Sequence, residues 1–189
     1  MAIDEVALAL ERGFLAREFL TWLWFRCEVE GGEFEVSGTP LAMVVEDALA
    51  LSTLEPDGTK VTIRGGTPTE RPEAAGALCT GLLLRKARLL LAQGEREWYF
   101  TLDGETLDVT GVKVPEPSEE DKDEEEDPLV AKLEAGEQLR EWMDALFRQF
   151  LELRLTDDWE RIEVARLSGW LRMKLDRSWE LVGAATGEE

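Results

Sequence analysis

Residues 13–30 (GFLAREFLTWLWFRCEVE) are apolar around almost the whole circumference of the helix that they predict. Arg17, Glu18 and Arg26 leave only a thin polar side. A helix of this kind is packed on two sides, by its own domain and by another element or chain. Glycines commonly end helices, so Gly31-Gly32 mark its end. We therefore expect a deeply buried helix over residues 13–30.

Tryptophan is frequent in the predicted helices. Trp22 and Trp24 lie two positions apart, so they point about 200° away from each other on a helix. One of them must meet a second surface, which is either the C-terminal part of the chain or another subunit. The candidate protein-interface residues are Trp22, Trp24, Trp142 and Trp170. Packing in the core is the alternative role for all four, because they lie at helical spacing among Leu and Phe.

The apolar pattern changes from helical to alternating after residue 32. Residues 33–37 and 60–64 alternate, and residues 95–102 have the aromatic and β-branched character of a strand. Turn chemistry at residues 55–58, 93–94 and 103–104 joins neighbouring strands into hairpins. The expected strands are 33–37, one or two within 41–54, 60–64, 82–92, 95–102 and 106–114, with a short helix at 73–80. The sequence predicts an α+β fold with an antiparallel meander of about five or six strands.

Residues 115–128 (PEPSEEDKDEEEDP) form an acidic run bounded by prolines. The run carries nine acids and one base in a chain whose net charge is −20. Self-repulsion and the lack of apolar side chains predict a disordered linker between residues 1–114 and residues 129–189. An acidic decoy for a basic partner is the functional alternative.

Apolar residues return at helical spacing beyond the linker. The first predicted stripe is Leu139, Met143, Leu146, Phe150 and Leu153, widened by Trp142 and Phe147. The second helix follows Thr156-Asp157-Asp158, and its apolar residues are Trp159, Ile162, Leu167, Trp170 and Leu171. Residues 129–189 thus predict an antiparallel helical hairpin that packs on the first part of the chain or on a partner.

The chain has no histidine, which removes most familiar catalytic and metal-binding arrangements. Without an imidazole there is no Ser-His-Asp or Cys-His nucleophile system and no mixed Cys/His metal site. Nucleotide-binding glycine motifs are missing too, and no pair among the 41 Asp and Glu residues is singled out by its spacing. We expect no enzyme activity, no cofactor and no metal, with a carboxylate-dependent enzyme as the least favoured alternative.

Three features predict a cytoplasmic protein that does not enter a membrane. The start Met-Ala-Ile-Asp-Glu lacks the pattern of a signal peptide. No apolar run reaches the roughly 18 residues that cross a bilayer. Cys27 and Cys79 are expected to be reduced thiols in the core, and a disulfide is the alternative.

The segment Arg85-Lys86-Ala87-Arg88 is the only dense basic group. On a strand, Lys86 and Arg88 share one face. They form a candidate nucleic-acid-binding surface together with Arg64 and Arg96, if neighbouring hairpins bring these alongside. An ordinary solvated strand face is the alternative. The net charge of −20 makes direct DNA binding doubtful, because the field of the whole protein repels polyanions.

Three phrases of the sequence, FLAREFLTWLWFR, GETLDVTGVKVPEP and LFRQFLELRL, resemble segments of bacterial recombination-associated proteins of the RdgC type. The resemblance covers residues 14–155. It implies a non-enzymatic protein that binds DNA without sequence preference, forms dimers and restrains the strand-exchange recombinase. Together with the charge, it leads us to expect a non-catalytic accessory protein of DNA recombination, repair or phage biology that works mainly through protein contacts, with a protein partner or as a homo-oligomer. An acidic assembly or adaptor subunit unconnected with DNA is the alternative.

Overall fold

The computed structural model describes residues 14–55, 57–116 and 128–186. The described chain opens with α2 (Phe14–Val29), the helix that the sequence predicts. Phe19, Leu23 and Trp24 are almost completely buried, although Trp24 points away from the side of the helix that Phe19 and Leu23 share. Beyond α2 the chain turns through Gly32, which has a positive φ angle. A Cβ there would stand 2.0 Å from the carbonyl oxygen of Met43, so only glycine fits at this turn.

Within the described residues, six strands form one antiparallel sheet, which confirms the predicted fold class. The strands are β1 (Glu33–Val36), β2 (Thr39–Ser52), β3 (Lys60–Arg64), β4 (Leu83–Gln93), β5 (Arg96–Asp103) and β6 (Val109–Lys113). Their spatial order is β1-β2-β4-β5-β6, and β3 also pairs with β2. The short helix α3 (Pro72–Cys79) follows a 3-10 turn, η1 (Pro68–Glu70), between β3 and β4.

Strand β2 is one continuous strand of 14 residues. The sequence itself predicts either one or two strands within residues 41–54. Its first half lies between β1 and β4, and its second half lies between β3 and β4. The register between β2 and β4 shifts between Val45 and Leu49. Such a β-bulge bends a strand and increases its twist. The long strand β2 can therefore pair with β1 through its first half and with β3 through its second half.

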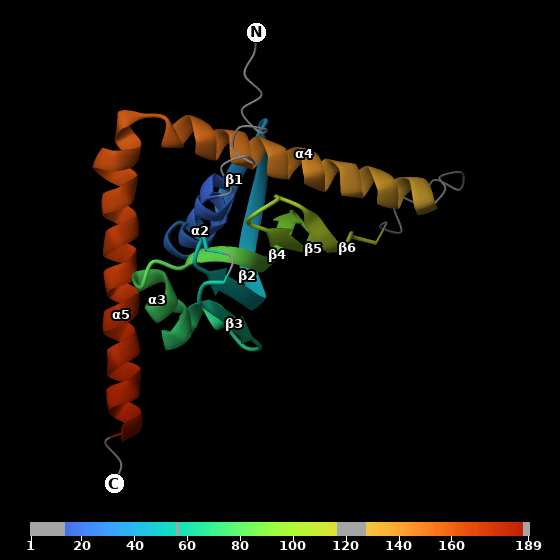
Figure 1. Cartoon of the computed structure of the whole chain (residues 1–189). Helices are drawn as coiled ribbons and strands as arrows, with labels where there is room; N and C mark the ends of the chain where they lie inside the picture. Colours follow the sequence, from blue (N-terminus) through green and yellow to red (C-terminus); the bar gives the residue numbers. More distant parts are fainter. Residues whose placement is uncertain (1–13, 56, 117–127, 187–189) are drawn as a thin grey trace.

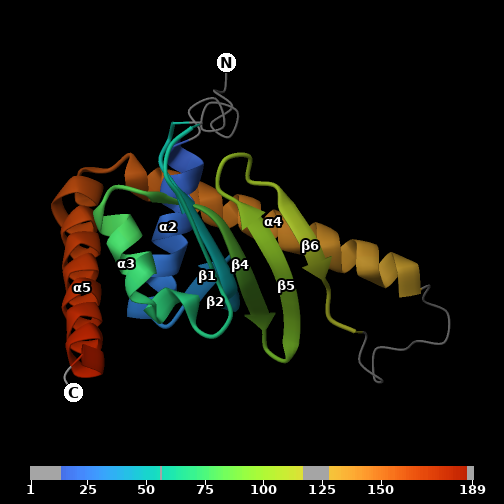
Figure 2. The same ribbon diagram turned by 60° about the horizontal axis from the view of Figure 1, so that its bottom comes forward.

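Two helices cover the same face of the sheet. Figure 2 shows the strands in front of α2 and of α4 (Pro128–Arg154). Trp98 of β5 is fully buried beneath α4, where its indole nitrogen donates a hydrogen bond to the backbone oxygen of Ala135 at 3.0 Å. Buried residues from both the sheet and the C-terminal helices join one hydrophobic core. The C-terminal part thus packs on the first part of the chain.

The two C-terminal helices form a hairpin-like pair. A π-helical stretch, η2 (Trp159–Glu163), leads from the turn after α4 into α5 (Val164–Thr186). The pair is open, because α4 runs along the sheet layer while α5 runs down beside α3 (Figure 1). The predicted stripe of α4 is buried as far as Phe150, and Leu153 is partly buried. Ile162 of the second helix is exposed. At regular helical spacing Ile162 points about 140° from Leu167 and 180° from Leu171, so these residues do not share one side of the helix.

Two further predictions concern the linker and the membrane. Residues 117–127, the greater part of the predicted linker, lie outside the described residues. In the described ranges, no helix combines the length and the apolar character that are needed to cross a bilayer.

Candidate binding surface on the outer face of the sheet

Among the described residues, no helix packs on the sheet face opposite α2 and α4, which we call the outer face (Figure 2). Val44, Leu90 and Tyr99 stand side by side in the register of β2, β4 and β5. Directly paired residues place their side chains on one face. The side chain of Val44 is 51% exposed, and those of Leu90 and Tyr99 are partly exposed. An apolar row of three side chains therefore crosses the outer face.

Acidic side chains border this apolar row on one side. Glu33 pairs with Ala42, Ala42 pairs with Ala92, and Ala92 pairs with Glu97, so these residues form the neighbouring row. The hydroxyl of Tyr99 donates a hydrogen bond to the Glu97 carboxylate at 2.8 Å, and this bond raises the pKa of Tyr99. The outer face thus has an acidic end.

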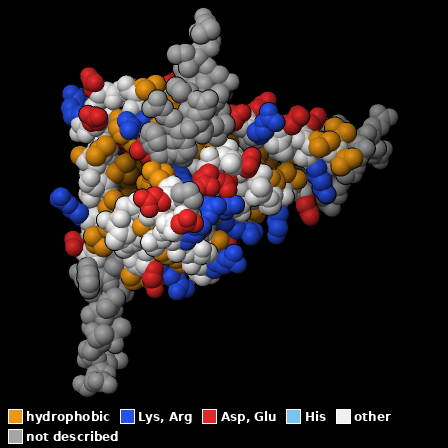
Figure 3. Space-filling model, in the orientation of Figure 1, with side chains coloured by type: hydrophobic (Ala, Val, Ile, Leu, Met, Phe, Trp, Pro, Cys, Tyr) orange, Lys and Arg blue, Asp and Glu red, His pale blue; other side chains and the backbone are white. Residues whose placement is uncertain are grey.

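Basic side chains border the apolar row on its other side. Arg64, Lys86 and Arg88 line a shallow pocket of about 360 Å³ beside the bulge of β2. Figure 3 shows Lys and Arg side chains gathered over this part of the sheet. The structure therefore brings together three of the four predicted phosphate-binding cations.

Two of these cations already form ion pairs with carboxylates of the same chain. Lys86 Nζ lies 2.9 Å from Asp103, and Arg88 Nε lies 3.7 Å from Asp47. Burial acts to raise the pKa of Asp103, but the hydrogen bonds from Lys86 and from the backbone N–H of Glu105 outweigh it and hold this pKa below its ordinary value. A phosphate group would have to displace bound carboxylates. The pocket therefore offers less positive charge to a nucleic acid than its three cations suggest.

Arg96 does not join this pocket. It begins β5, with its guanidinium carbon 5.1 Å from the centre of the Trp98 ring. Trp98 faces the helices. Because alternate residues of a strand face opposite sides, Arg96 belongs to the side of Trp98 and Lys86 to the other. The sequence prediction assumed that neighbouring hairpins bring Arg96 alongside Lys86 and Arg88. The alternation within β5 instead places Arg96 on the opposite face of the sheet, the face that the helices cover.

The four candidate interface tryptophans are at most 6% exposed, so they offer no surface to a partner. Trp24 packs edge-on against Trp170 at 5.3 Å, and Trp142 packs edge-on against Trp98 at 4.9 Å. Trp22 contacts Phe150 of α4 at 5.6 Å. The second surface that α2 needs is therefore supplied by the C-terminal helices of the same chain. Of the two surfaces that the sequence left open for α2, the C-terminal part of the same chain is the one that packs against it.

The two cysteines are both free thiols. Burial raises the pKa of Cys27 to about 12, so this thiol stays protonated and is a poor nucleophile. Cys79 is exposed at the end of α3, which corrects its predicted place in the core. No cluster of three or more metal-ligating side chains occurs in the part of the chain that the structure describes.

Arg17 of α2 has a role that sequence reasoning missed. Although charged, it is only 5% exposed, and its guanidinium donates to the backbone oxygen of Thr53 at 2.6 Å and to the hydroxyl of Ser52 at 3.2 Å. It also forms an ion pair with Glu105. These contacts join α2 to the end of β2 and to the turn between β5 and β6. The available signal was an arginine in a helix that is apolar around most of its circumference.

Neither a protein-family model nor a curated protein matches this chain.

Proposed function

We propose that the chain is a non-catalytic accessory protein of DNA recombination or repair that binds a protein partner on the outer face of its sheet. The observation that carries the proposal is the apolar row of Val44, Leu90 and Tyr99. A sheet with one solvated face ordinarily presents polar residues there. Exposed apolar side chains rimmed by polar ones mark interaction sites.

Charge supports a basic surface on the partner. Glu33 and Glu97 flank the apolar row, while Lys86 and Arg88 are paired with carboxylates of the chain itself. With a net charge of −20, the protein attracts cationic surfaces and repels DNA at long range. A protein that contacts DNA presents such a basic surface. The recombination setting itself rests on the resemblance of residues 14–155 to proteins of the RdgC type.

A second candidate function is an adaptor or assembly subunit unconnected with DNA. It is favoured by the pairing of Lys86 with Asp103 and of Arg88 with Asp47, which weakens the argument for a phosphate contact. This function would use the same outer face.

A strand-exchange reaction with a purified bacterial recombinase tests the proposal. We expect the wild-type protein to slow the formation of joint molecules, and less so at high salt because the attraction is electrostatic. Val44→Lys should lose this effect, because it places a cation in the apolar row. Leu54→Lys is the matched control, since Leu54 is exposed outside the outer face, between β2 and β3.

Two outcomes would contradict the proposal in different ways. If the wild-type protein leaves strand exchange unchanged, the recombination setting fails and the adaptor function is preferred. If Val44→Lys inhibits as strongly as Leu54→Lys, the outer face is not the docking surface.

A further inference from the structure

One edge of the outer face is acidic where β1 forms it. β1 pairs with the first half of β2 and β3 pairs with the second half, so the two short strands follow each other along the same edge of the sheet. The ring of Phe34 lies 6.1 Å from that of Trp22 in α2, so Phe34 faces the helices. Its neighbours Glu33 and Glu35 therefore face outward, and both are exposed.

The same edge is basic where β3 forms it. Ile63 is buried, so Lys60, Thr62 and Arg64 face outward, and all three are exposed. Among the described residues, Lys60 and Arg64 have no ion-pair partner, and neither do the two glutamates of β1. The cations of β3 thus differ from the cations of β4, which are already paired.

The apolar row lies between the acidic and the basic end of this edge. Glu33 pairs with Ala42, two residues before Val44, which places it about 7 Å from the row at 3.3 Å per residue. Arg64 pairs with Ala48, in the bulge on the other side of Val44. Four residues of β2 advance there no farther than two residues of β4. The bulge therefore brings Arg64 to a similar distance from the row.

A second copy of the chain presents charges that match both ends. Two copies whose sheets pack face to face are related by a two-fold axis that lies between the sheets. If this axis follows the apolar row, it turns the β1 end of each copy toward the β3 end of the other. Glu33 then faces Arg64, and Glu35 stands between the positions of Arg64 and Lys60. The edge is therefore complementary to itself.

The side chains on the axis meet their own counterparts. Val44, Leu90 and Tyr99 bring two apolar rows together. Lys113 of β6 pairs with Tyr99 at the far end of the row and is exposed. It lies diagonally across from Glu97 of β5, so a carboxylate stands beside each of the two lysines that approach the axis.

We propose that two copies of the protein cover each other's outer face about this axis, with β1 of each copy opposite β3 of the other. The charge of −20 on each copy opposes the approach, and the apolar row is short. The association is therefore weak and depends on concentration. The second copy occupies the surface assigned above to a protein partner, so the two compete; this consequence rests on the proposed function.

Sedimentation velocity of the protein alone, in about 150 mM salt and at concentrations up to about 1 mM, tests the arrangement. We expect the wild type to approach the sedimentation coefficient of two chains. Glu33→Lys with Glu35→Lys should stay monomeric, and so should Lys60→Glu with Arg64→Glu, because each double variant places like charges opposite one another. An equal mixture of the two should form a dimer, since both of its contacts again join opposite charges.

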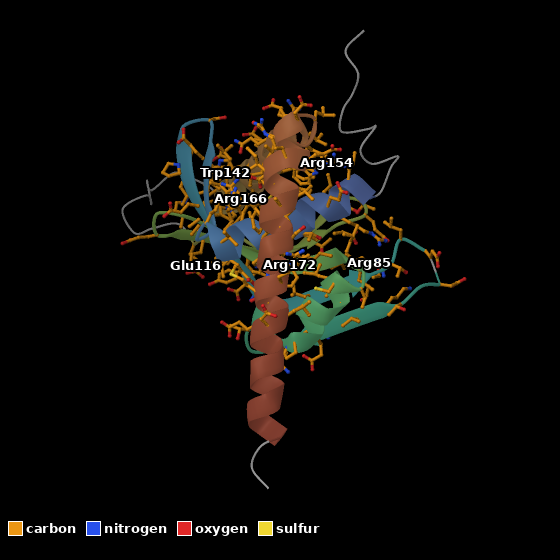
Figure 4. The ribbon with its side chains drawn as sticks, turned by 90° about the vertical axis from the view of Figure 1, so that its left-hand side faces the viewer. Arg85, Glu116, Trp142, Arg154, Arg166 and Arg172 are labelled. Atoms are coloured by element: carbon orange, nitrogen blue, oxygen red, sulfur yellow. The ribbon has the colours of Figure 1, made fainter. Side chains whose placement is uncertain are left out.

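Matched charge reversals outside the outer face are the controls. They are Glu134→Lys with Glu141→Lys on α4, and Arg148→Glu with Arg172→Glu, all at exposed positions. Figure 4 shows Arg172 on α5, the helix nearest the viewer. Both controls should associate as the wild type does, and unchanged thermal unfolding establishes that all the variants are folded. The reversal in β1 lowers the net negative charge, so long-range repulsion does not explain a loss of association there.

Three results overturn the proposal: a wild type that is monomeric at every concentration, a wild type that grows beyond two chains, and a mixture of the β1 and β3 variants that stays monomeric. The strand-exchange reaction is a separate measurement. A monomeric protein that slows strand exchange contradicts only the dimer. A dimeric protein that leaves strand exchange unchanged contradicts only the proposed function.

Discussion

At the scale of single residues, the two side chains of the Arg17–Glu105 ion pair differ in their exposure to solvent. The side chain of Arg17 is buried, whereas that of Glu105 is 37% exposed. A charge left alone in the interior costs much more than a charge left alone at the surface, where water solvates it. The two partners of this ion pair should therefore not be equivalent in a mutational experiment.

Glu105→Gln should lower the free energy of unfolding by about 3 kcal/mol, because it leaves the Arg17 guanidinium buried without its counter-charge. Arg17→Met should cost about 1 kcal/mol, because the carboxylate that remains is partly solvated and the methionine fills the space. Urea unfolding followed by circular dichroism measures both values. A larger loss for Arg17→Met than for Glu105→Gln would contradict the argument.

At the scale of elements, α5 is held to α2 by an aromatic and ionic cluster around Trp24. Trp170 packs against Trp24, and its indole nitrogen donates a hydrogen bond to Glu28 at 2.9 Å. Lys174 forms an ion pair with the same carboxylate at 2.8 Å. The contact that fixes the second C-terminal helix therefore comes from the polar edge of α2 as well as from its apolar side.

Trp24→Ala and Trp22→Ala should each lower the free energy of unfolding by roughly 3–5 kcal/mol, since both indoles are buried on opposite sides of α2. Thermal or urea unfolding provides the measurement. Acrylamide quenching offers an independent check, because buried indoles are protected from the quencher. Free quenching of both tryptophans in the folded wild-type protein would contradict this burial.

The sequence predicted most elements because their apolar periodicity is strong. Residues 33–37 and 60–64 alternate in sequence, so their buried face follows from the pattern alone. The consecutive apolar residues 89–91 and 98–100 do not show which face is buried. The exposure of Ile162 was predictable from regular helical spacing, which places it about 180° from Leu171 on α5. The apolar row was not predictable, since the register of β2 on β4 is set by tertiary packing.

At the scale of the whole molecule, the field of a chain with a net charge of −20 opposes any local attraction for DNA. Near physiological salt, screening limits the range of this field to about 8–10 Å. The charges immediately around the pocket of Arg64, Lys86 and Arg88 then determine whether DNA is attracted. There Lys86 and Arg88 are paired with Asp103 and Asp47. Both the distant and the local charges therefore disfavour a direct contact with duplex DNA.

We expect the protein alone to bind duplex DNA no more tightly than about 10⁻⁴ M, the weak edge of non-specific binding. Fluorescence anisotropy of a labelled duplex across a salt series gives the affinity and its salt dependence. The double variant Lys86→Glu with Arg88→Glu is the control, and it should behave as the wild type does. Micromolar binding near 100 mM salt that this double variant abolishes would instead support direct binding, with a slope of about −0.9 for each phosphate contacted.

The continuous strand β2 also bears on the order in which the sheet assembles. The β1–β2 and β4–β5 pairs are local hairpins, whereas β2 meets β4 across a long stretch of chain that includes β3, η1 and α3. Closing such a loop lowers the conformational entropy of the chain before stabilising contacts between β2 and β4 form. Non-local pairing of this kind slows folding, so we expect the pairing of β2 with β4 to limit the folding rate. Until it occurs, the apolar side chains that β2 and β4 bury against α2 remain open to water and to other chains.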